Sequence, residues 1–172
     1  MEPFIGKEVE SMVEANGKVM YWPDRDGLTP ILRAYKAGNL FTAAFLCNLS
    51  PEAATIVDPD GNTFWHLLVK HPSHYFVHRL LQKTALREVL KQGDKDGKTP
   101  LFLALENNRF DILEDFLDIW ERQRNELPAT YTQRQPECRW LVDLLKIPNK
   151  AGKTSEDLIA ESTCLPSKNI IK

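Results

Sequence analysis

The chain has 172 residues, of which 42% are hydrophobic and 27% are charged, a composition typical of a folded globular domain that excludes wholesale disorder. Its 22 lysines and arginines nearly balance its 24 aspartates and glutamates, so the net charge is only -2. A dedicated nucleic-acid binder carries a positive excess, and we therefore expect a folded domain that does not bind nucleic acid.

The three cysteines, Cys47, Cys138 and Cys164, indicate an intracellular, reducing setting. They form no C-x-x-C pair, and their odd number leaves at least one thiol unpaired in any disulfide scheme. The longest nearly apolar stretch, residues 40–49, is about half as long as a bilayer span. The N-terminus lacks the basic and apolar regions of a secretory signal. We therefore expect a cytoplasmic protein with no membrane partner.

Residues 1–23 precede the first copy of a repeated motif. A short helical pattern in this segment ends at Asn16-Gly17, and the following residues 19–22 are of types that favour strands. The first unit of a repeat array exposes one face of its core unless another segment covers it. We therefore expect residues 1–23 to form an N-terminal capping segment.

The repeated motif is the frame Asp/Asn-x-x-Gly-x-Thr, which occurs four times. Its glycines are Gly27, Gly61, Gly97 and Gly152, which are 34, 36 and 55 residues apart. An Asp or Asn followed by this glycine predicts a tight turn in which the glycine has a positive φ. The threonine predicts the cap of a following helix, and in two copies Pro30 or Pro100 supplies the favoured first helical residue.

Apolar spacing after the frames predicts two short antiparallel helices in each unit. In the third copy Leu101, Ala104 and Leu105 share one helical face. Asn108 then suits a left-handed turn, and Phe110 begins a second apolar series. A turn followed by a helix pair therefore recurs along the chain.

This unit, with a period of about 33 residues, resembles the ankyrin repeat. Residues 29–34 and 99–104, Thr-Pro-Ile-Leu-Arg-Ala and Thr-Pro-Leu-Phe-Leu-Ala, are similar to the family's Thr-Pro-Leu-His-x-Ala motif. The second copy, residues 63–69, departs from the motif because large residues replace its small pair.

The resemblance implies an all-α fold, a solenoid of helix-turn-helix units joined by short β-turn or hairpin tips. The expected boundaries are 1–23 for the N-terminal cap, 24–57, 58–93 and 94–148 for three repeats, 149–162 for a C-terminal cap and 163–172 for a tail.

The longest glycine spacing predicts a helical insertion at about residues 119–147 of the third repeat. We expect the helix before it to stop at Pro128 and a new helix to open at Pro136. The apolar face of the new helix contains Trp140, Leu141, Leu144 and Leu145. We expect this face to pack within the chain, and the alternative is that Trp140 anchors a partner.

The resemblance implies a non-enzymatic protein-protein interaction module. Such an adaptor, scaffold or inhibitor binds another protein through its concave face and turn tips, here as a monomer without cofactor or metal. The family also includes proteins that bacteria or viruses send into host cells, so a host-directed effector in the host cytoplasm is one form of this expectation.

The family's contact positions can be carried over to this chain. At the turn tips they are Arg25, Asp26, Leu28, Pro59, Asp60, Asn62, Lys95, Asp96, Lys98, Lys150, Ala151 and Lys153. On the concave helices they are Lys36, Ala37, Lys70, His71, Glu106 and Asn107, and Trp140 is added from the insertion. Four lysines at the third and fourth tips predict a basic bias in the C-terminal half. The other interpretation is that these lysines only solubilise the turns.

A second hypothesis makes the protein a small enzyme or modifying factor whose chemistry lies in the insertion around Cys138. A depressed thiol pKa at Cys138 would favour it. Metal binding is the alternative for the histidines, since His74 and His78 have the spacing of one helical face. No acidic residue lies among the histidines, and the resemblance gives His66 a hydrogen-bonded role that ties adjacent turns together.

Overall fold

The computed structural model describes residue 11 and residues 16–72, 75–126 and 136–162. This part of the chain is mostly helical and contains no strand, which confirms the all-α expectation. With η denoting a 3-10 helix, the elements are η1 (Gly17–Tyr21), α2 (Pro30–Lys36), α3 (Leu40–Leu49), η2 (Pro51–Thr55), α4 (Phe64–Leu68), α5 (Tyr75–Leu81), α6 (Thr84–Arg87), η3 (Glu88–Lys91), α7 (Pro100–Glu106), α8 (Phe110–Glu126), α9 (Pro136–Leu145) and α10 (Ser155–Glu161). Across these residues every helix is too short or too polar to span a bilayer. The expected tail 163–172, the loop 129–135 and most of the N-terminal cap lie outside the described residues.

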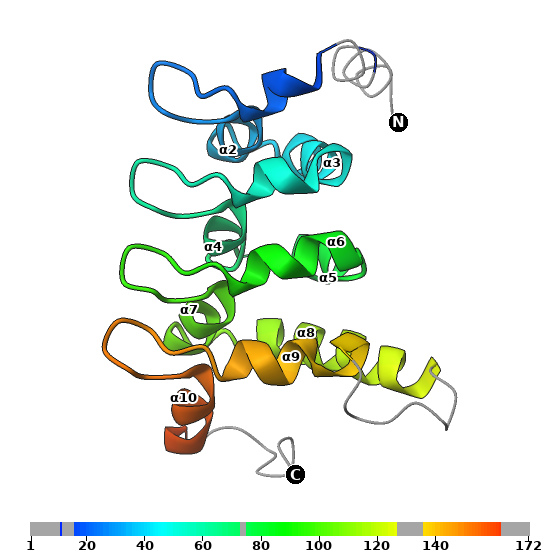
Figure 1. Ribbon diagram of the computed structural model, residues 1–172, viewed down its shortest axis with the longest axis vertical. Coiled ribbons are helices and arrows are strands. Elements are labelled where there is room, and N and C mark those ends of the chain that lie inside the picture. Colours follow the sequence, from blue (N-terminus) through cyan, green and yellow to red (C-terminus); the bar gives the residue numbers. More distant parts are fainter. Residues whose placement is uncertain (1–10, 12–15, 73–74, 127–135, 163–172) are drawn as a thin grey trace.

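The helices form four units that are stacked in chain order (Figure 1). Each unit opens with a turn and continues with a first helix, and the first helices α2, α4, α7 and α10 form a column beside the turns. A second helix follows in the first three units: α3, α5 and α8. Neighbouring units pack through like helices, α2 on α4, α4 on α7, α7 on α10, α3 on α5 and α5 on α8. Each unit therefore buries its apolar face against the next.

A further helical segment, besides the first and second helices of the units, precedes every turn. The insertion makes this segment longer in the third unit. The segments η1, η2, η3 and α9 form a further column in Figure 1. Each ends three or four residues before the Asp or Asn of its turn. The helices expected on either side of the insertion are confirmed, because α8 ends at Glu126 and α9 begins at Pro136. Much of the added length therefore extends elements that the other units also have.

The strand-like character expected at residues 19–22 is wrong. Residues 17–21 form the 3-10 helix η1, which buries Met20 to 1% exposure against the first unit. The backbone N–H of Trp22 closes the last turn by donating to the Val19 carbonyl at 3.3 Å. The β-branched and aromatic residues of this segment, Val19, Tyr21 and Trp22, stay exposed, so burial of the single Met20 outweighs their strand preference.

The large residues of the second unit belong to the core. Phe64 is 1% exposed and Trp65 is completely buried, both in α4, which has five residues where α2 and α7 have seven. Bulky side chains in this short helix fill the centre of the stack, so the departure of residues 63–69 from the family motif is accommodated by packing.

Side chains also tie neighbouring units together by bonding to backbone carbonyls. The Tyr35 hydroxyl of the first unit donates to the Leu67 carbonyl of the second at 2.9 Å. Arg109 of the third unit donates to the carbonyls of Val69 and His71 at 3.2 and 2.6 Å. These bonds supply donors to carbonyls at and just beyond the end of α4, where the helical N–H groups that would donate to them are missing.

Candidate interaction surface

Four turns of nearly identical geometry form one edge of the stack. In each turn the side-chain Oδ1 of the first residue accepts hydrogen bonds from the backbone N–H groups two and four residues later, at 2.9–3.1 Å. These first residues are Asp24, Asp58, Asp94 and Asn149. The glycine of each turn has a φ of 75–80°, which confirms the expected positive φ. The repeated frame is thus one rigid turn in which side chain and backbone are both satisfied.

The turn threonines cap their helices in different ways. Thr99 and Thr154 each accept, at 3.2 Å, the N–H of the third residue of the helix, as expected. The Thr29 hydroxyl is buried without any hydrogen-bond partner, so the expectation of a side-chain cap is wrong there. In the second unit Thr63 and His66 form a capping box: the Thr63 side chain accepts from the His66 N–H, and the Thr63 N–H donates to Nδ1 of His66 at 3.0 Å.

His66 joins the second turn to the third. Its ring is completely buried, and Nδ1 accepts from the Thr63 N–H, so Nε2 carries the proton and donates to the Lys98 carbonyl at 2.9 Å. Burial lowers the pKa of His66, because a charged ring would be removed from water. The hydrogen-bonded role between adjacent turns is therefore confirmed for this histidine.

The third and fourth turns are also in direct contact. The backbone N–H of Lys150 donates to the carbonyl of Asp96 at 2.9 Å. A Cβ atom placed on Gly97 would lie 3.0 Å from the Lys150 nitrogen, closer than side chains normally approach backbone. This contact requires glycine both for its φ and for its lack of a side chain.

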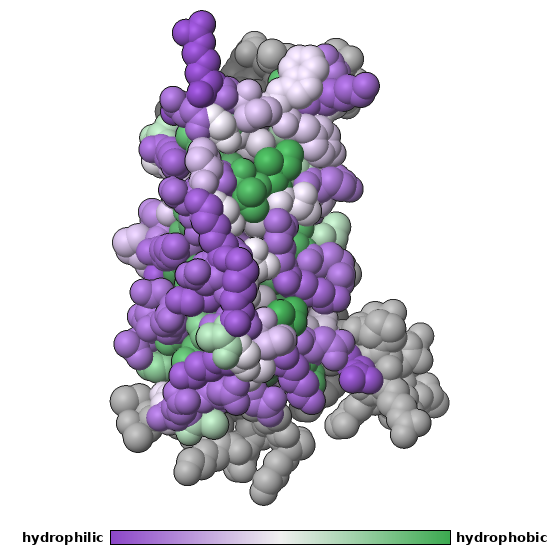
Figure 2. All heavy atoms as spheres, turned by 60° about the vertical axis from the view of Figure 1, so that its left-hand side comes forward, coloured by the Kyte–Doolittle hydropathy of each residue, from purple (hydrophilic) through white to green (hydrophobic). Residues whose placement is uncertain are grey.

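Most of the expected contact residues lie on one exposed row, which we call the interaction row. Its exposed members are Arg25, Asp26, Lys36, Asp60, Lys70, Lys95, Asp96, Glu106, Asn107 and Lys150. Asn62, His71, Lys98 and Lys153 are partly buried beside them. The row follows the turns and the ends of the first helices along the whole stack. Hydrophilic residues predominate on the side that carries the turns, and hydrophobic residues are confined there to small separate areas (Figure 2).

Two expected contact residues are inaccessible, and their assignment is corrected. Leu28 is 3% exposed and belongs to the core of the first unit. Trp140 is 7% exposed, with its ring 6.0 Å from Phe116 and 5.2 Å from the guanidinium of Arg87. Its indole N–H donates to Gln123 at 3.2 Å. The face of α9 therefore packs within the chain, which confirms the intramolecular interpretation.

Ion pairs with glutamates neutralise two of the four lysines that the C-terminal turns carry, Lys98 and Lys153. Glu106 at the end of α7 accepts two hydrogen bonds from Lys98, at 2.8 and 2.9 Å, and these bonds raise the pKa of Lys98. Lys153 pairs with Glu161 at the end of α10 in the same way, at 2.6 Å. Lys95 donates to the Pro59 carbonyl at 2.7 Å. Among the tip lysines of the described chain, only Lys150 is left without such a partner.

Unpaired positive charge lies instead in the first and second units. The positions equivalent to Glu106 and Glu161 are Lys36 at the end of α2 and Lys70 just after α4. Both are exposed and form no ion pair among the described residues. At the first turn Arg33 binds Asp24 and Asp26, which leaves Arg25 as a further unpaired cation. Among the described residues of the row, cations without an ion pair are therefore more frequent in the first two units than in the last two.

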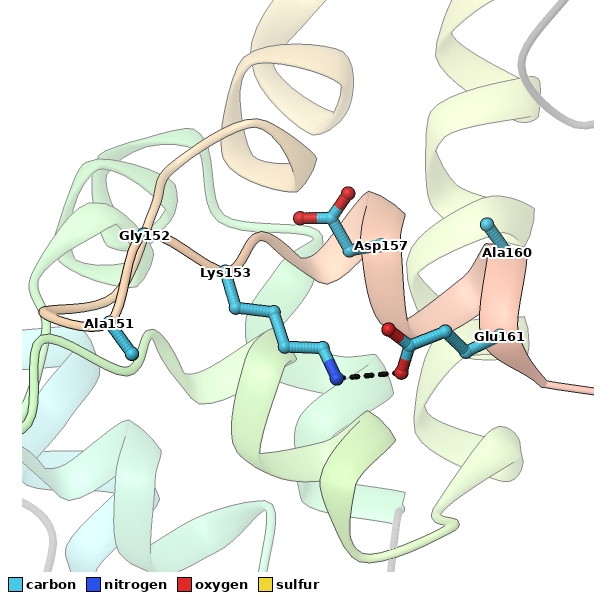
Figure 3. A pocket seen from close by; sticks show the side chains of 6 residues that line it. All are labelled: Ala151, Gly152, Lys153, Asp157, Ala160 and Glu161. Atoms are coloured by element: carbon cyan, nitrogen blue, oxygen red, sulfur yellow. Dashed lines mark hydrogen bonds and ion pairs between the residues drawn. The ribbon is translucent and has the colours of Figure 1, made fainter.

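A shallow depression lies at the C-terminal end of the described stack (Figure 3). Its volume is about 500 Å³, and its lining comes from the fourth turn and from α10. Lys153 and Glu161 are joined by their ion pair along it, and Asp157 points away from that pair. The Asp157 carboxylate caps α10 by accepting from the Thr154 N–H at 2.8 Å, which lowers the pKa of Asp157. These side chains already serve the helix end.

The thiols and histidines provide little for chemistry where the structure describes them. Burial raises the pKa of Cys47 to about 12, so its sulfur stays protonated and unreactive. The side chain of Cys138 and all of Cys164 lie outside the described part. Within the described residues no three His, Cys, Asp or Glu side chains form a group that could hold a metal ion.

No protein-family model matches the chain, and no curated protein matches it. The candidate surface is therefore interpreted from its own geometry. Rigid turns and helix ends present charged side chains in regular order, which suits contact with a second macromolecule.

Proposed function

We propose that this protein is an ankyrin-type repeat protein and that it acts as a non-enzymatic interaction module. It binds a partner protein along the interaction row, where turn tips and first-helix ends of successive units lie side by side. The observation that carries the proposal is the register of this row: equivalent positions of the units, counted from the turn threonine, recur along it as exposed side chains. Stacked repeats commonly use such an extended surface for binding proteins.

The rigidity of the row supports this function. Each turn is closed by two bonds to one carboxylate or amide oxygen, and the turns of the second, third and fourth units are linked through His66 and Lys150. A surface that is ordered before binding loses little conformational entropy on association. The polar character of the turn side in Figure 2 favours a partner that contributes complementary charges.

A site-specific photo-crosslinker tests the proposal. The crosslinker replaces Lys36, Asp60 or Lys95 on the row, and in a control variant it replaces Glu121, which is exposed on α8 away from the row. We expect the row variants to crosslink one common protein in cells that produce the chain, and the Glu121 variant to leave that protein unlabelled. Equal labelling from Glu121, or no labelled protein from any row position, would contradict the proposal.

A further inference from the structure

The first and second units share a pairing of lysine and aromatic residue that the third unit lacks. Lys36 is followed five residues later by Phe41, at the start of α3, and Lys70 is followed five residues later by Tyr75, at the start of α5. The equivalent residues of the third unit are acidic, Glu106 and Asp111. We call Lys36, Phe41, Lys70 and Tyr75 the basic aromatic edge.

The rings of this edge form a fixed cluster with a large exposed area. Phe41 is 65% exposed and Tyr75 is 54% exposed, which are high values for aromatic side chains in a folded domain. Between them lies Phe76, which is 6% exposed and meets both rings edge-to-face, at 5.0 Å from Phe41 and 5.4 Å from Tyr75. The buried ring holds its two exposed neighbours in place, so the apolar surface exists before any partner binds.

The two units are also joined next to the lysines. Tyr35, which precedes Lys36, packs edge-to-face on His71, which follows Lys70, at 6.2 Å between ring centroids. Both lysines are exposed and have no ion-pair partner in the described chain, whereas Glu106 of the third unit accepts from Lys98. Positive charge therefore accompanies the aromatic rings in the first two units and gives way to acidic side chains at the third.

We propose that the basic aromatic edge binds an acidic polypeptide segment that carries a large apolar side chain. The apolar side chain packs against Phe41 and Tyr75, and flanking carboxylates pair with Lys36 and Lys70. The inference rests on the proposed function and names the chemistry of the partner. Aromatic anchors beside complementary charges are the usual composition of an interface centre.

A nucleic acid fits this edge less well. Aromatic rings can stack on bases, but strand binding also needs a groove of cations that follows the phosphates. Here the third unit places Glu106 and Asp111 at the equivalent positions, and α8 adds the exposed Glu114. Glu106 and Asp111 are paired with Lys98 and Arg109, so the third unit offers no continuation of the unpaired cations that a phosphate backbone would need.

Selection from a phage-displayed library of random short peptides tests the inference. The full chain is the bait, and enriched peptides are synthesised with a fluorescent label for anisotropy titration. We expect enriched sequences to contain several Asp or Glu residues around one Leu, Phe or Trp. Their affinity should fall at least about tenfold in the double variant Phe41→Ser/Tyr75→Ser and in the double variant Lys36→Glu/Lys70→Glu. Added salt should weaken binding to the unaltered chain.

Matched controls separate the edge from general surface effects. Trp22→Ser removes another exposed aromatic residue, and Lys146→Glu reverses an exposed lysine that lies off the interaction row. Both controls should bind the peptides within about twofold of the unaltered chain. Melting curves should show that all variants are folded, because every substituted side chain is exposed.

Several outcomes would overturn the inference. It fails if the selected peptides lack acidic residues, or if the two double variants bind them as tightly as the unaltered chain does. It also fails if the chain binds oligothymidylate more tightly than any selected peptide, or if it self-associates in a way that Phe41→Ser abolishes. Peptides whose binding depends instead on Asp26 and Lys95 would overturn this inference and leave the proposed function standing. If no peptide binds and no row position crosslinks a protein, both proposals fail.

Discussion

Replacing His66 by phenylalanine removes the link between the second and third turns while retaining a ring of similar size. The substitution leaves the buried Thr63 N–H, which now donates to Nδ1 of His66 at 3.0 Å, without a partner. It also removes the 2.9 Å bond from Nε2 to the Lys98 carbonyl, which keeps its bond from the Asp94 N–H. An unpaired buried polar group costs about 1–3 kcal/mol. Loss of the bond to Lys98 adds to this cost and burial of a more apolar ring offsets part of it, so we expect His66→Phe to lower the free energy of unfolding by about 1–3 kcal/mol.

The same residue predicts a dependence of stability on pH. Burial lowers the pKa of His66 in the folded state, whereas the unfolded chain has the ordinary value of about 6.5. As the pH falls below about 6.5, the unfolded state therefore gains a proton that the folded state does not. The contribution of His66 to stability is constant above this pH and is lost below it, at up to about 1.4 kcal/mol per pH unit until the folded pKa is reached.

Urea denaturation followed by circular dichroism, at about pH 7.5 and about pH 5.5, measures both effects. His66→Asn provides a matched comparison, because its Oδ1 can still accept from Thr63 but its side chain is too short to reach Lys98. It should retain part of the stability that His66→Phe loses. His71→Asn, at a partly buried position of the same unit, should cost less than either. A His66→Phe protein within about 0.5 kcal/mol of the unaltered chain, or one with the same acid sensitivity, would refute the reasoning.

Three further predictions concern the turns and the insertion, all measured by denaturation. Gly97→Ala should cost about 2–3 kcal/mol and Gly152→Ala about 1 kcal/mol, because both residues have a positive φ but only a Cβ on Gly97 meets the next turn; equal costs would remove that contact. Thr99→Val should cost about 1 kcal/mol through loss of the cap, whereas Thr29→Val should be neutral or stabilising because its hydroxyl has no partner; the opposite order would contradict the hydrogen-bond assignment. Trp140→Ala should cost about 3–5 kcal/mol, as for a core tryptophan, and an unchanged melting temperature would place this side chain outside the core.

Features set by neighbouring residues were predictable from the sequence. The positive φ of the turn glycines follows from one short frame, and Asn108 adopts the expected left-handed conformation with a φ of 56°. The helix of the insertion begins at Pro136, as predicted, because proline at the first helical position loses no hydrogen bond. These features depend on backbone rules that act within a few residues.

Features set by contacts between distant residues were not predictable. The 3-10 helix at residues 17–21 has a strand-like sequence and depends on burial of Met20. The positions of the row were accessible from the repeat register, but its charge was not. Lys98 is neutralised by Glu106, a residue eight positions later in the same unit. The first unit has Lys36 at the position equivalent to Glu106, and this lysine has no ion pair among the described residues. The repeat register predicts where each side chain lies on the surface, but it does not predict which charged side chains form ion pairs.

The side-chain hydrogen bonds that cross between units are unevenly distributed, so the resistance to bending should differ along the stack. His66, Arg109 and Lys95 all bridge the second and third units, whereas Tyr35 bridges the first and second. The second and third units are therefore held together by more side-chain hydrogen bonds than the first and second units are. The exposed rings of Phe41 and Tyr75 belong to the first and second units, on either side of the boundary with fewer bonds. A ligand that contacted both rings would therefore also stabilise the packing of these two units.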